Sequence, residues 1–119
     1  MNTPVLRVKK PWGEEIIYAR ANGYVGKLIV VEKGHRLSLQ FHRRKHETFY
    51  VLKGRCRVTA GKQTSLLLAG GAFAIPPKTI HRFEAPYGRV TLLEASTGPD
   101  SDIVRLSDDY GRAKSKRRK

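Results

Sequence analysis

Short runs of residues that favour β-strands recur along this chain, and glycine or proline interrupts them about every ten residues. Before residue 103, no segment has the long 3.6-residue apolar period of an amphipathic helix. The runs predict strands at Glu14–Ala19, Val25–Glu32, Arg36–His42, Thr48–Leu52, Arg55–Ala60, Thr64–Leu68, Ala72–Ile75, His81–Glu84 and Arg89–Ala95. We therefore predict an all-β, single-domain fold, a small β-barrel or sandwich of the jelly-roll kind.

The C-terminal part of the chain is less regular. Asp102–Arg112 is predicted either as one short helix or as an ordered tail that wraps the body. Five of the last six residues are lysine or arginine. We therefore predict a domain over residues 1–112 and a disordered basic tail over residues 113–119.

Length and composition limit the cellular setting. The chain has 119 residues, the usual size of one domain, and its one cysteine, Cys56, cannot form an internal disulfide. No apolar stretch approaches the ~20 residues of a membrane-spanning helix, and the N-terminus lacks the apolar core of a secretory signal. We expect a cytoplasmic protein that has no contact with membranes.

The charge is strongly positive. Lysine and arginine number 24 against 10 aspartate and glutamate residues, which gives a formal net charge of +14. A basic body favours anionic partners, either nucleic acid or phosphorylated small molecules. We expect the basic tail to be a solvated, solubilising end, with contact to nucleic acid as the less favoured alternative.

Alternation along three predicted strands directs polar side chains toward the interior. Gln40 and His42 share one face of their strand, and Glu47 shares a face with Phe49 and Val51. A carboxylate on an apolar face is costly unless it is paired or bound to a metal. His81 repeats the pattern two residues before Phe83. Together, Gln40, His42, Glu47 and His81 form a nitrogen and oxygen ligand set for one divalent ion.

The spacing of these residues resembles the two motifs of the cupin superfamily. Gly34–His42, followed by Glu47 and Gly54, fits the first motif G-x5-H-x-H-x3–4-E-x6-G, with glutamine in place of the first histidine. Gly70-x5-Pro76-x4-His81 fits the second motif, with Lys78 in place of its second glycine.

Further segments are similar to the cupin domain of type II mannose-6-phosphate (phosphomannose) isomerases and their single-domain relatives. The matching segments are Lys10-Pro11-Trp12-Gly13, Leu37–His42, Ile75–Arg82 and Asp102–Arg112. The resemblance extends over residues 8 to 112, and it departs from the family pattern at Thr48-Phe49, where relatives commonly have His-Trp.

The resemblance implies a site and an activity. It assigns Gln40, His42, Glu47 and His81 as ligands of one divalent ion, Zn²⁺ first, with Mn, Ni, Co or Fe as alternatives. It implies interconversion of an aldose and a ketose on a sugar or sugar phosphate, and a homodimer. Arg82 matches the arginine that follows the last ligand in these isomerases and is assigned to substrate binding, although alternation points it away from His81.

Isomerisation also needs a general base, and a phosphate needs cationic partners. By inward alternation the candidate catalytic residues are Lys27, in phase with Ile29, and Glu94, in phase with Leu92. Arg36 lies on the predicted ligand face of its strand and is the candidate for binding a phosphate, with Lys27 as a second candidate.

Two other functions remain open at this point. Because cupins host many chemistries, the chain could instead be a non-catalytic cupin that binds a sugar or acts as a regulator. It could also be a metal-dependent dioxygenase, which would need iron.

Overall fold

The computed structural model describes residues 1–99 and 101–113, and in these ranges the regular elements are strands. They are β1 (Leu6–Lys10), β2 (Gly13–Ala21), β3 (Tyr24–Val31), β4 (Leu39–Phe41), β5 (Glu47–Lys53), β6 (Cys56–Ala60), β7 (Gln63–Leu67), β8 (Ala72–Ile75), β9 (His81–Glu84), β10 (Val90–Ser96) and β11 (Val104–Ser107). The described residues contain no helix that is long and apolar enough to span a membrane.

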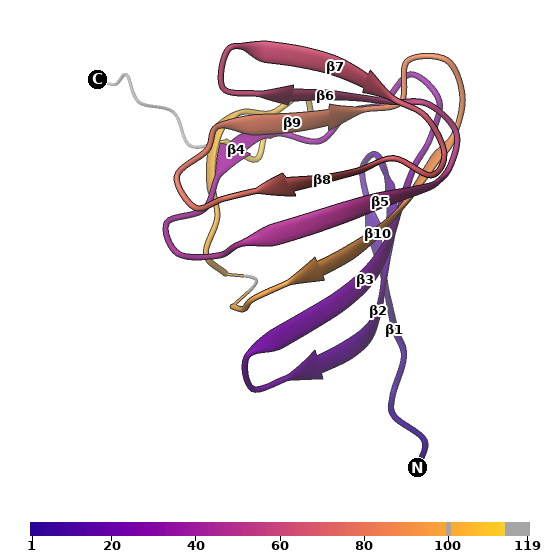
Figure 1. Cartoon of the computed structure of the whole chain (residues 1–119), viewed down its shortest axis with the longest axis vertical. Helices are drawn as coiled ribbons and strands as arrows, with labels where there is room; N and C mark the ends of the chain where they lie inside the picture. The colour runs from indigo at the N-terminus through magenta and orange to yellow at the C-terminus, as the bar shows by residue number, and fades with distance from the viewer. Residues whose placement is uncertain (100, 114–119) are drawn as a thin grey trace.

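The strands form two antiparallel sheets, which appear as an upper and a lower layer in Figure 1. One sheet has the order β1-β2-β3-β10-β5-β8, and the other has the order β11-β4-β9-β6-β7. β10 inserts between β3 and β5, so strands that are distant in sequence share a ladder. The all-β jelly-roll prediction is confirmed.

The core lies between the two sheets. Phe49 of β5 and Phe83 of β9 face each other across the layers, with their ring centroids 4.5 Å apart, and Phe73 of β8 packs against both. Each fully buried phenylalanine contributes about 1.5–3 kcal/mol to stability. This aromatic cluster fills one part of the interior, and polar side chains line the rest.

The C-terminal segment follows the ordered-tail alternative of the sequence analysis. β11 pairs with β4, placing Arg105 directly opposite Gln40. Of the predicted basic tail, residues 113–119, only residue 113 belongs to the described part of the chain. The prediction for the tail therefore lies outside the described residues.

Two strand predictions need correction. The predicted strand Arg36–His42 is reduced to β4, because residues 36–38 make only an isolated bridge from Arg36 to Glu84. β1 was not predicted, since its run Leu6–Lys10 is mostly exposed and carries three cations. Charged residues of this kind are typical of edge strands, which is the position that β1 occupies.

Candidate metal centre

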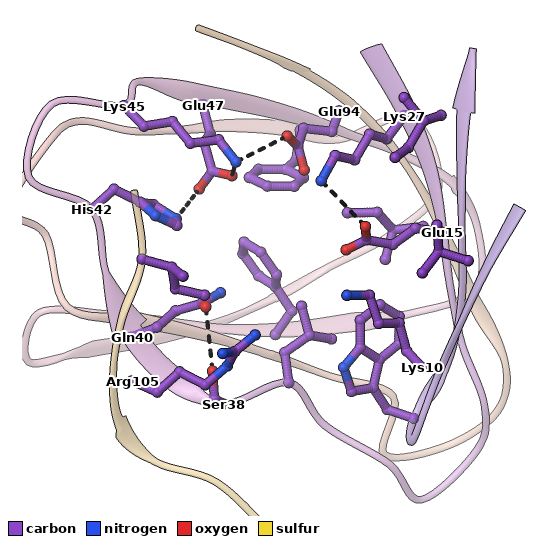
Figure 2. Close-up of a pocket in the computed structure, with 18 of the residues that line it drawn as sticks. Lys10, Glu15, Lys27, Ser38, Gln40, His42, Lys45, Glu47, Glu94 and Arg105 are labelled. Atoms are coloured by element: carbon purple, nitrogen blue, oxygen red, sulfur yellow. Dashed lines mark hydrogen bonds and ion pairs between the residues drawn. The ribbon is translucent and has the colours of Figure 1, made fainter. Parts of the chain in front are cut away.

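A cavity of about 280 Å³ lies between the sheets, beside the aromatic cluster. Its walls come from β1, β2 and β3 on one side and from β4 and β11 on the other, and β5 and β10 also contribute (Figure 2). Most polar residues selected by alternation line this cavity, as the following paragraphs describe.

Two histidines and one glutamate converge at one end of the cavity. His42 follows β4, Glu47 begins β5 and His81 begins β9, so both sheets contribute. Glu47 Oε1 lies 3.0 Å from His42 Nε2 and 3.4 Å from His81 Nε2. All three side chains are buried, and their ligand atoms lie within 4.8 Å of one another.

The second nitrogen of each imidazole determines what the first can do. His42 Nδ1 lies 2.5 Å from the carbonyl oxygen of Asp102, and His81 Nδ1 lies 2.8 Å from that of Thr79. A carbonyl oxygen only accepts, so each Nδ1 carries a proton, and each Nε2 presents a lone pair when its ring is neutral.

With both rings neutral, the converging atoms have no hydrogen to share. Among the described residues, His42 Nε2, His81 Nε2 and Glu47 Oε1 are buried and have no hydrogen-bond partner. Three buried acceptors that face one another repel unless a cation lies between them. Two imidazole nitrogens and one carboxylate oxygen fit a divalent metal ion, and the carbonyl contacts to Nδ1 are the outer support that metal-bound histidines usually have.

Gln40 lies next to this cluster, as alternation predicted. It is the register partner of His81 across β4 and β9, so the two side chains share a face of the sheet. Its Oε1 accepts a hydrogen bond from Ser38 Oγ at 3.2 Å. The side chain is buried and lines the cavity.

A buried lysine links Glu47 to a second carboxylate. Lys45 Nζ lies 3.2 Å from Glu47 Oε2 and 3.6 Å from Glu94 Oε2, and Ser96 Oγ donates to Glu94 Oε2 at 2.7 Å. Burial favours the neutral form of Glu47, but its close contacts with His42 and His81 and the charge of Lys45 outweigh this effect, and the pKa of Glu47 is lowered. Burial, followed by the charge of Glu47, raises the pKa of Glu94.

Both predicted catalytic residues face the cavity. Lys27 and Glu94 are register partners on β3 and β10, and both are buried. Lys27 Nζ also lies 3.2 Å from Glu15 Oε1. Figure 2 shows Lys45, Glu94 and Lys27 side by side along the upper wall, with alternating charges.

The two predicted substrate-binding arginines do not line the cavity. Arg36 donates two hydrogen bonds to the Asp109 carboxylate, at 2.7 and 2.9 Å. Arg36 precedes β4, which begins only at Leu39, so the alternation of a regular strand does not apply to its side chain. Arg82 donates to the backbone carbonyl oxygens of Leu37 and Ser107, at 2.9 and 3.3 Å. Its position confirms that it points away from His81, and these contacts tie β9 to the segments on either side of it.

Several cavity residues were not predicted to belong to the site. Lys45 lies in the loop before β5, where strand alternation gives no signal. Lys10 lies on the edge strand that was not predicted. Arg105 and Arg112 also line the cavity. Both belong to the segment Asp102–Arg112, whose resemblance to the isomerase family was the sequence feature that could have pointed to them.

Two facing antiparallel sheets with a buried His/Glu/His cluster between them define a cupin domain. The family model "Mannose-6-phosphate isomerase C-terminal" matches residues 3–108, and the chain belongs to this family.

The curated relatives are longer proteins. The chain is 33% identical over 111 residues to mannose-1-phosphate guanylyltransferase RfbM of Salmonella typhimurium, covering 90% of this chain and 23% of the relative. It is 36% identical over 110 residues to the alginate biosynthesis protein AlgA of Pseudomonas aeruginosa, covering 88% and 23%. The chain therefore spans about a quarter of the length of these relatives.

Solved structures share the fold. KdgF from Halomonas sp. matches with a TM-score of 0.73 and 20% identity, covering 83% of this chain and 90% of that one. Streptomyces Pac13, described as a nucleoside dehydratase, also matches with a TM-score of 0.73 and 20% identity, covering 87% and 86%. These likenesses establish the cupin architecture.

Proposed function

We propose that this chain is a metal-dependent isomerase that interconverts an aldose and a ketose, with a sugar or sugar phosphate of the mannose 6-phosphate type as substrate. The observation that carries the proposal is the convergence of His42 Nε2, His81 Nε2 and Glu47 Oε1, without hydrogen-bond partners, at one end of a polar cavity. Membership of the mannose-6-phosphate isomerase C-terminal family supports the choice of reaction.

His42, Glu47 and His81 would hold the metal, with Gln40 as the fourth ligand. Two imidazoles, a carboxylate and an amide suit Zn²⁺ first among the divalent ions, and Mn, Ni, Co and Fe also accept such ligands. A bound divalent ion supplies Lewis-acid polarisation of a sugar carbonyl.

The reaction moves one proton between adjacent carbon atoms. Glu94 is the proposed base: it accepts the proton from carbon 2, next to the carbonyl, and returns it to carbon 1, while the hydroxyl proton on oxygen 2 passes to oxygen 1. Its raised pKa, caused first by burial, makes its carboxylate a stronger base than an exposed one. Lys27 and Lys45 flank it with positive charge and stabilise the carboxylate after it has lost the proton again.

Solvent exchange tests this proposal directly. Metal-loaded protein incubated with mannose 6-phosphate in deuterated water is expected to form fructose 6-phosphate that carries deuterium at carbon 1, as followed by proton NMR. Glu94→Gln should lower the rate by about 100-fold or more and keep the metal content. Glu32→Gln, a surface carboxylate paired with Arg89, is the matched control and should retain the rate.

Other outcomes would replace the proposal. If neither phosphorylated nor free aldoses exchange deuterium with the metal-loaded protein, the chain is not an isomerase. Iron in the purified protein together with consumption of oxygen would favour the dioxygenase instead.

A further inference from the structure

The cavity is lined by more cationic than anionic side chains. Six cationic side chains line the cavity, Lys10, Arg20, Lys27, Lys45, Arg105 and Arg112, against three anionic ones, Glu15, Glu47 and Glu94. A divalent ion held by Glu47 would increase this excess of positive charge. Such a concave, positively charged site attracts an anionic ligand.

Arg105 has a buried donor that no described residue accepts from. Its Nε is buried and has no hydrogen-bond partner among the described residues. Its neighbour Arg112 is held instead by Asp108, which accepts from Nε and Nη2 at 2.9 and 3.0 Å. Burial, followed by the nearby charge of Arg112, lowers the pKa of Arg105, although the charges of Asp108 and Glu15 oppose this shift.

The strand register locates Arg105 relative to the metal centre. Arg105 pairs with Gln40 across β11 and β4, and Gln40 pairs with His81 across β4 and β9. The three residues therefore follow one another across the same face, and two strand spacings, about 10 Å, separate the backbones of Arg105 and His81. Figure 2 shows the guanidinium group of Arg105 beside Ser38, directed into the cavity, and Lys10 extending from the opposite wall.

We propose that Arg105, with Lys10 facing it, forms a subsite for a phosphate monoester at the end of the substrate remote from the metal. The phosphate identity rests on the proposed isomerase function, whereas the anion subsite rests on the geometry of Arg105 alone. A guanidinium with a free Nε–H offers a fork of donors that matches two oxygens of a phosphate group.

Phosphate binding can be measured separately from catalysis. The full chain is titrated with inorganic phosphate by calorimetry, with and without Zn²⁺, and then with mannose 6-phosphate and with mannose. We expect Arg105→Gln to weaken binding of phosphate and of mannose 6-phosphate about tenfold or more, and to leave mannose and Zn²⁺ binding unchanged. Arg55→Gln, an exposed arginine over Tyr87 on another part of the surface, is the matched control and should bind as the wild type does.

Two further measurements separate a subsite from a structural role. Removal of a half-buried cation whose Nε has no hydrogen-bond partner should leave the thermal midpoint unchanged or raise it, whereas removal of a structural arginine should lower it. Arg105→Lys keeps the charge but loses the donor fork, so it should also weaken phosphate binding, and it serves if the glutamine variant fails to fold.

The outcomes are distinguishable. Phosphate binding that is unchanged in both Arg105 variants overturns the subsite, even if the chain isomerises mannose 6-phosphate. Loss of phosphate binding in these variants supports the subsite, even if no isomerisation is observed. Tighter binding of glucuronate than of mannose 6-phosphate, lost in the same variants, would replace the phosphate by a carboxylate and overturn the proposed ligand class.

Discussion

The Lys45 ammonium group is enclosed by two carboxylates in the interior of the domain. Its Nζ contacts Glu47 at 3.2 Å and Glu94 at 3.6 Å, and all three side chains are almost fully buried. The lysine separates two negative charges that would otherwise repel each other in a region of low dielectric constant. It therefore positions both the proposed ligand and the proposed base.

Replacement of Lys45 by methionine should be strongly destabilising. The change leaves two buried carboxylates without their shared cation, and breaking such a pair costs about 3–5 kcal/mol. Chemical denaturation of the metal-free protein measures the loss, and Lys53→Met, which changes an exposed lysine of β5, is the control. A loss below about 1 kcal/mol, the range of an exposed ion pair, would contradict this role.

Cys56 is expected to be chemically inert in the folded protein. Its side chain is fully buried between the sheets, and burial raises the pKa of its thiol to about 12. The reactive thiolate is therefore scarce near neutral pH. A thiol reagent should label Cys56 only at the rate of unfolding, and fast stoichiometric labelling of the native protein would show that the interior is more open than described.

At the scale of elements, the loop between β4 and β5 carries His42 of the candidate metal centre, and its conformation depends on Asp102. The Asp102 carboxylate accepts hydrogen bonds from the backbone N–H groups of Arg43, Arg44 and Lys45, at 2.8–2.9 Å. Its own carbonyl oxygen orients His42. The segment before β11 thus fixes the loop that presents both His42 and Lys45.

Asp102→Ala should weaken metal binding without removing a ligand. Loss of the three carboxylate contacts loosens the loop, and loss of such outer support typically costs about 10–100-fold in metal affinity. Competition with a chromophoric chelator measures the change. Asp109→Ala, which frees the Arg36 side chain on the surface, is the matched control and should bind metal as tightly as the wild type.

The same carboxylate makes the loop sensitive to acid. The backbone hydrogen bonds, first that from Arg43, lower the pKa of Asp102 below its ordinary value. Its contribution to stability is therefore complete above the unfolded pKa of about 3.9 and is lost as the pH falls through the folded value. The difference in the free energy of unfolding between wild type and Asp102→Ala should be constant near neutral pH and shrink below about pH 4. A difference that stays constant at all pH values would contradict a stabilising role of the ionised Asp102 carboxylate.

The sequence predicted the central strands and the cluster better than the edges. Alternation around Glu47 and His81 placed both side chains inside, because each shares a face with a large apolar residue of the same strand. The same rule failed for Arg36, since it assumed a regular strand that the chain enters only at Leu39. Lys45 reaches the cavity from a loop, and Arg105 reaches it from β11, which pairs with β4. Such pairing between segments distant in the sequence leaves no local pattern from which either position could be predicted.

At the scale of the molecule, metal binding should stabilise the whole domain, because the candidate ligands come from both sheets. Metal at 100 times its dissociation constant would add about 2.7 kcal/mol. For a domain of this size each kcal/mol raises the thermal midpoint by about 4 °C. Zn²⁺ should therefore raise the midpoint of the wild type by roughly 10 °C or more, and a chelator should reverse it. An unchanged midpoint would show that the sheets are not linked through a metal.

The metal content of the purified chain tests the central claim most directly. Elemental analysis of protein prepared without chelators should give close to one divalent ion per chain in the wild type. His42→Ala and His81→Ala should lose it, and His46→Ala, an exposed histidine next to Glu47, should keep it. The absence of metal from the wild type, with no uptake on reconstitution, or equal metal content in all variants, would contradict the proposed centre.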